Sequence, residues 1–130
     1  MPYPSAVHPE KVGTYPARTH SGGGYFYDQV LEYRVWCHPE RGAPDVHQGS
    51  DYFHAFAALA FSQKQPGSEA PLVFVRQQEY IDEPSPGTFV RKSGERLTEW
   101  LPEWLENSQR RPGSIEAFLA QHKTKPNQAT

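Results

Sequence analysis

Several common signatures are scarce in this sequence, and each absence narrows what the protein can be. A single cysteine, Cys37, excludes an intramolecular disulfide and fits a reducing compartment. No segment approaches the ~20 consecutive apolar residues of a membrane-spanning helix. The first residues, MPYPSAVHPEK, lack the apolar run of a secretory signal. We therefore expect a soluble, cytoplasmic protein without a membrane partner.

An excess of charge of either sign is also missing. The chain has 13 Lys and Arg residues against 15 Asp and Glu residues, which gives a formal net charge of −2. Nucleic acids and anionic membranes favour a basic surface, so this balance argues against both as partners. Local basic groups such as the Arg110–Arg111 pair are most simply solvated surface charge. The oligomeric state stays open.

The chain is long enough for one domain with a real core. Its 130 residues include 13% aromatic residues, each of which can bury ~150–250 Å². Prolines and the run Gly22–Gly24 interrupt residues 1–24, which we expect to lie across the surface as an extended arm. Residues 25–122 are expected to form the domain, and residues 123–130 a frayed polar tail.

Alternating side chains predict the first strand. From Leu31 to Cys37 every second residue is apolar or aromatic, whereas Glu32 and Arg34 share the opposite face. Period two with β-branched and aromatic residues is typical of a strand, here expected over residues 25–37. Cys37 continues the apolar face and is expected to be buried.

The remaining segments complete an α+β pattern. Residues 51–64 combine alanines with apolar residues at spacings of three and four, which predicts a helix. The further expected elements are strands over 72–81, 88–92 and 95–101, a hairpin turn at Ser93–Gly94, a helical turn from Pro102, and a helix over 114–122 with Ser114 as N-cap. The order β-α-β-β-β-α predicts a single α+β domain, with a mixed or antiparallel sheet of about four strands and helices on one face.

The glycine-rich loop is the first candidate for a functional site. Three consecutive glycines can turn backbone N–H groups inward and form a nest for an anion, and an arginine can add a bidentate contact to phosphate or carboxylate. The alternative is that the glycines only allow a sharp turn into the strand. The candidate ligand-binding residues are Arg18, His20, Ser21, Gly22, Gly23 and Gly24, with Tyr25 and Tyr27 beside them.

Histidines in the N-terminal half are a weaker candidate. His20, His47 and His54 are competent metal ligands. No tight pair of the kind seen in metal motifs is present, so ordinary loop histidines are the simpler interpretation, and no metal site is assigned. Adjacent strand residues point to opposite faces, so His38 is poorly placed to activate Cys37. The carboxylates are scattered, and no catalytic residue is assigned.

Four segments carry a resemblance to a known family: AVHPEKVGTYPARTHSGGGYFYD, VLEYRVWCHPERGAP, EPSPG and ERLTEW. Over nearly the whole chain the sequence resembles a family of short bacterial proteins that often carry the label of a GNAT-type N-acetyltransferase. The resemblance implies acetyl-CoA as cofactor and Tyr25 or Tyr27 as proton donor to the departing thiolate. The coenzyme loop of such enzymes reads Arg/Gln-x-x-Gly-x-Gly/Ala. Its nearest match, Arg18 to Gly24, has Ser21 where a glycine is expected.

Three hypotheses of function follow. The first is a binding module for a small anionic ligand or a partner protein, centred on the glycine-rich loop. The second is an acyl-CoA-dependent N-acetyltransferase, which the family resemblance implies. The third is a metal-binding protein that uses the N-terminal histidines.

Overall fold

The molecule is organised around one antiparallel sheet. The computed structural model describes residues 3–17, 20–21, 23–59 and 65–122. The sheet runs in the order β1-β5-β4-β2-β3, and only the pair β1–β5 is parallel. Its strands are β1 (His20–Ser21), β2 (Gln29–Cys37), β3 (Tyr52–Phe56), β4 (Leu72–Ser85) and β5 (Thr88–Trp100). With one α-helix beside this sheet, the predicted α+β class is confirmed.

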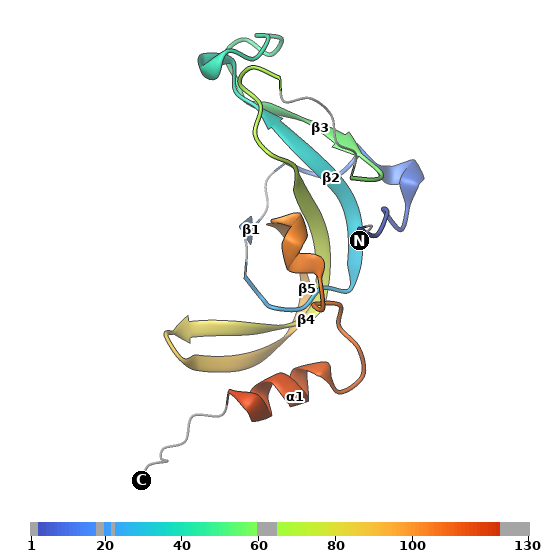
Figure 1. The fold of residues 1–130 in the computed structure, drawn as a ribbon, viewed down its shortest axis with the longest axis vertical. Helices are drawn as coiled ribbons and strands as arrows, with labels where there is room; N and C mark the ends of the chain where they lie inside the picture. The colour runs from blue at the N-terminus through green and yellow to red at the C-terminus, as the bar shows by residue number, and fades with distance from the viewer. Residues whose placement is uncertain (1–2, 18–19, 22, 60–64, 123–130) are drawn as a thin grey trace.

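Helical segments are short and lie outside the sheet. They are η1 (Pro9–Lys11), η2 (Pro39–Arg41), η3 (Pro102–Leu105) and α1 (Ser114–Gln121). Figure 1 shows α1 beside the distal part of the long β4–β5 hairpin. The helical turn expected from Pro102 is confirmed. Ser114 is the first residue of α1 rather than its N-cap, which is Gly113. No helix in the described part of the chain is long and apolar enough to cross a membrane.

The prediction of a helix over residues 51–64 is wrong for residues 51–59, which the structure describes. Tyr52–Phe56 is strand β3, which pairs antiparallel with β2 from Cys37↔Tyr52 to Tyr33↔Phe56. The sequence YFHAF also has a period of two, and its Phe53 ring packs on Trp36 with 4.9 Å between centroids. Cross-strand packing of this kind outweighs the helix propensity of the neighbouring alanines. Residues 60–64 lie outside the described residues.

The hairpin turn expected at Ser93–Gly94 is also wrong. β5 continues through both residues, and the chain reverses between Ser85 and Thr88, which pair with each other. Opposite the step from Gln77 to Glu79, β5 contains one extra residue. Gly94, with φ of 121°, therefore lies in a β-bulge rather than a turn.

The principal core lies on one face of the sheet. It joins Tyr27, Val30, Tyr33, Val73, Val75, Trp100 and Leu105. A second cluster packs α1 on the hairpin through Phe26, Ile81 and Ile115. Cys37 is 6% exposed, which confirms the expectation that it is buried.

The later part of the N-terminal arm, residues 13–16, covers the other face of the sheet. Glu32 and Arg34 point to this face, and both are fully buried. The N–H of Gly13 donates to Glu32 Oε1 at 2.8 Å, and Arg34 Nη2 donates to the carbonyl oxygen of Pro16 at 2.7 Å. Earlier in the arm, the N–H of Val7 donates to the carbonyl oxygen of Val30. The arm is thus tied to β2 at several points.

Candidate ligand-binding site

The glycine-rich loop is only partly described. Arg18 and Gly22 lie outside the described residues. The backbone of His20 and Ser21 forms β1, which pairs with Thr98 and Glu99 of β5. β1 therefore brings the loop to the edge of the sheet, next to the last residues of β5.

The two described glycines of the loop are fixed to the sheet by their carbonyl groups. Trp100 Nε1 donates to Gly23 O at 2.9 Å, and the N–H of Ile81 donates to Gly24 O at 3.0 Å. Both glycines have positive φ, of 79° and 87°. A Cβ at Gly24 would lie 2.2 Å from Gln77 Nε2. These contacts explain why glycine is needed here, and anion binding by the loop stays a prediction.

The two tyrosines that follow the loop point to different places. Tyr25, with φ of 63°, donates its hydroxyl to Glu83 Oε1 at 2.8 Å, and this hydrogen bond raises the pKa of Tyr25. The Tyr27 ring turns into the core and lies edge-on to Trp100, with 5.8 Å between centroids. Tyr27 is thus the predicted site residue that reaches a cavity of the molecule.

That cavity has a volume of about 820 Å³. Three segments form its walls: the arm before η1, residues 26–30, and the connector, by which we mean residues 106–113 between η3 and α1. Tyr3, Val30 and Leu105 provide apolar surface, whereas Gln29 and Asn107 provide amides. We call this space the connector cavity. Its volume lies in the usual range for small-molecule sites, about 300–1,000 Å³.

The connector is held rigidly against the start of β2. The N–H of Tyr27 donates to Ser108 O at 3.1 Å, and the N–H of Arg110 donates to Tyr27 O at 2.8 Å. These bonds form a parallel bridge between Tyr27 and Gln109. Asn107, with φ of 61°, turns the chain into this bridge. The residues on either side of the bridge are therefore positioned before any ligand arrives.

Tyr27, which lines the connector cavity, has an unpartnered hydroxyl group. The residue is 5% exposed, and the hydroxyl has no hydrogen-bond partner among the described residues. The hydroxyl is not among the fully enclosed side-chain atoms of the described residues that lack a hydrogen bond, so it is not sealed off from solvent. Burial raises the pKa of Tyr27, and the Arg111 guanidinium offsets part of the rise. The hydroxyl is therefore protonated at neutral pH.

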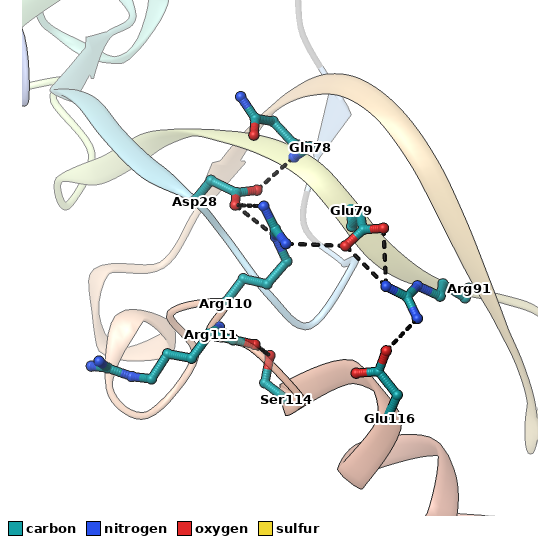
Figure 2. A network of polar contacts seen from close by, with 8 residues as sticks. All are labelled: Asp28, Gln78, Glu79, Arg91, Arg110, Arg111, Ser114 and Glu116. Atoms are coloured by element: carbon teal, nitrogen blue, oxygen red, sulfur yellow. Dashed lines mark hydrogen bonds and ion pairs between the residues drawn. The ribbon is translucent and has the colours of Figure 1, made fainter.

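The two arginines of the connector have different surroundings. Arg110 donates to Asp28 Oδ1 at 2.6 Å and to Glu79 Oε1 at 3.0 Å, and the Asp28 carboxylate raises the pKa of Arg110. Arg111 lines the connector cavity and has no carboxylate partner in the described ranges. Its Nη2 donates to Gln109 Oε1 at 3.4 Å. Figure 2 shows the Arg111 side chain pointing away from the ion-pair network.

The network beside the cavity joins α1 to the sheet. Arg91 bridges Glu79 and Glu116, so acidic and basic groups alternate along the chain of contacts in Figure 2. Asp28 Oδ2 also accepts from the N–H of Gln78 at 2.6 Å. Both oxygens of Asp28 are therefore occupied, and no hydrogen bond or ion pair joins this carboxylate to Arg111 in the described part of the chain.

A second cavity, of about 720 Å³, lies near β3 on the far side of Tyr3. Val35, Cys37 and Phe56 make much of its surface apolar, and its described lining contains no lysine or arginine. Its polar groups include Glu69 and Glu103. This chemistry disfavours an anion.

The histidines do not gather around a common point. The His47 and His54 rings each lie near the Tyr52 ring, at 5.2 Å and 5.7 Å between centroids. His38 contacts Asp51 with one ring nitrogen and Glu69 with the other. Within the described ranges, no three His, Cys, Asp or Glu side chains form a group that could hold a metal ion.

Sequence reasoning named Tyr27 as a candidate site residue, and it did not name Arg111, which lines the same cavity. The Arg110–Arg111 pair was visible as local basic charge, but the sequence could not show that Arg110 is paired and Arg111 is not. No protein-family model, curated protein or solved structure matches this chain. The resemblance to the short bacterial family, with its implied acetyl-CoA, therefore stays a prediction.

Proposed function

We propose that this protein is a binding module for a small anionic ligand, which lies in the connector cavity beside Tyr27 and Arg111. The observation that carries the proposal is the Tyr27 hydroxyl, a donor without a partner on a side chain that is 5% exposed. Because the hydroxyl is not fully enclosed, it is free to donate to a bound acceptor, and such a hydrogen bond contributes about 0.5–1.5 kcal/mol.

The two donor groups of the cavity indicate the charge of the ligand, because Asp28, which also lines the cavity, is already paired with Arg110. A protonated phenol and a guanidinium are both donors, and arginine matches the geometry of carboxylate or phosphate. Arg111 has no carboxylate partner in the described part of the chain, so an anion would meet a cation that is not already neutralised. Because hydrogen bonds on both sides of Tyr27 hold the connector, little ordering is needed on binding.

The test is calorimetric titration of the full chain with inorganic phosphate, succinate and coenzyme A. We expect Arg111→Ala to weaken the binding of an anion by about 1.5–3 kcal/mol, which is roughly 10- to 150-fold. Tyr27→Phe keeps the ring in the core and should weaken binding by about 0.5–1.5 kcal/mol. Arg41→Ala, which removes another exposed arginine, is the matched control and should bind normally.

Two outcomes would overturn the proposal. The first is that none of the three probes binds at millimolar concentration. The second is that a probe binds the Arg111→Ala variant as tightly as the original chain. Binding of coenzyme A that is indifferent to Arg111 would instead support the acetyltransferase hypothesis at another place on the molecule.

A further inference from the structure

The connector cavity also contains an unpaired carboxylate. Glu106 lines the cavity at the end of η3, is exposed, and forms no ion pair or side-chain hydrogen bond among the described residues. Arg111 lines the same cavity and also lacks a partner of opposite charge there. The two side chains are not bonded to each other, although only five positions separate them.

The backbone between these two residues is held in place. Asn107 adopts a left-handed conformation directly after Glu106. The carbonyl of Ser108 and the N–H of Arg110 are both bonded to the backbone of Tyr27. Glu106 and Arg111 therefore precede and follow a segment that is fixed against the residues before β2.

Resting on the proposed function, we infer that the ligand is a small zwitterion of the amino-acid type. Its carboxylate would contact Arg111 and the Tyr27 hydroxyl, and its ammonium would contact Glu106. A ligand with both charges satisfies all three groups, whereas a simple anion would leave Glu106 unpaired and bring a second negative charge near it. The apolar side chains of Tyr3, Val30 and Leu105 favour an apolar or aromatic substituent on the ligand.

The charge requirement can be tested with matched probes. L-Phenylalanine carries both charges, 3-phenylpropanoate lacks the ammonium, and phenethylamine lacks the carboxylate. By calorimetry on the full chain, we expect L-phenylalanine to bind about fivefold or more tightly than 3-phenylpropanoate. Phenethylamine should bind more weakly than both, because it has no carboxylate to contact Arg111.

The variants assign the effect to the two charges. Glu106→Gln should remove the preference for L-phenylalanine over 3-phenylpropanoate while leaving 3-phenylpropanoate bound. Glu103→Gln, a neighbouring exposed carboxylate that lines the other cavity, is the control and should keep the preference. Arg111→Ala should weaken both probes. Unfolding of Glu106→Gln in urea should match that of the original chain, because Glu106 has no partner in the described ranges.

The two proposals fail in different ways. If 3-phenylpropanoate binds through Arg111 as tightly as L-phenylalanine, the zwitterion inference is overturned and the anion site stands. A preference for L-phenylalanine that survives Glu106→Gln also overturns it. If neither probe binds and phosphate, succinate and coenzyme A do not bind either, the anion site itself is wrong.

Discussion

The guanidinium carbon of Arg34 lies 3.8 Å from the centroid of the Phe74 ring, inside the protein. Phe53 covers the guanidinium from another side at 4.3 Å. Arg34 Nε donates to Glu32 at 2.6 Å and Nη1 donates to Glu99 at 2.9 Å. A fully buried charge is costly unless it is paired and hydrogen-bonded, and each of the three guanidinium nitrogens of Arg34 donates a hydrogen bond.

Substitution of Arg34 should therefore destabilise the folded protein strongly. We expect Arg34→Met to lower the free energy of unfolding by about 3–5 kcal/mol, because it leaves Glu32 buried without its counter-charge. Arg34→Lys keeps the charge but loses the planar fork and the ring stacking, so its loss should be intermediate. Equilibrium unfolding in urea measures both. A Met variant as stable as the original chain would show that Glu32 is not held by this pair.

The same residues show how far the sequence could predict the fold. Alternation from Leu31 to Cys37 correctly predicted a strand. It did not show that Glu32 and Arg34 are fully buried, because the N-terminal arm that covers them is distant in sequence. Over residues 51–64 the spacing of apolar residues fitted a helix, yet the pairing of Tyr52–Phe56 with β2 made a strand. Local propensity cannot anticipate that partner.

The candidate site was predictable to a similar degree. Aromatic residues after the glycine-rich loop pointed to Tyr27. The sequence could not show that the Tyr27 ring enters the core while Tyr25 reaches Glu83. The cavity itself requires the connector to return to the start of β2, and this is a tertiary contact between the Tyr27 backbone and that of Ser108 and Arg110.

The glycine-rich loop offers a matched pair of substitutions. Gly23→Ala and Gly24→Ala both place a Cβ on a residue with positive φ, which costs roughly 1–2 kcal/mol. At Gly24 the Cβ would also collide with the fully buried Gln77 side chain, whereas at Gly23 the nearest atom is 4.0 Å away. We expect overpacking to lower the free energy of unfolding of Gly24→Ala by a further amount of about 1–3 kcal/mol. Urea unfolding of the two variants gives the difference, and equal losses would contradict the collision.

The ion-pair network in Figure 2 should be strong at one end and weak at the other. The Asp28 side chain is 11% exposed, whereas that of Glu116 is 59% exposed. Asp28→Asn should cost about 1.5–3 kcal/mol, because Asp28 accepts from Arg110 and from the N–H of Gln78. Glu116→Gln should cost much less, and salt should reduce that cost further. Urea midpoints at low and high salt test this ranking. Equal losses of stability in the two variants would contradict it.

His38 gives the fold a pH dependence whose direction can be stated. A hydrogen bond to Asp51, and a smaller effect of the hydrogen bond to Glu69, raise the pKa of His38 above 6.5. Partial burial offsets some of the rise. Both ring nitrogens face carboxylates, so both contacts are hydrogen bonds only when the ring is protonated. The stabilisation should be fully present below about pH 6.5 and lost as the pH rises through the raised pKa of the folded state.

The comparison of the original chain with His38→Gln isolates this contribution. The difference in unfolding free energy between the two should be larger at about pH 5.5 than at about pH 8.5, because the unfolded histidine titrates near its ordinary pKa of about 6.5. In NMR titrations of the His38 ring, Asp51→Asn and Glu69→Gln should each lower the His38 pKa by removing one acceptor. If the stability difference grows with rising pH instead, His38 is held by its neutral form, and the two carboxylates do not act as its partners in solution.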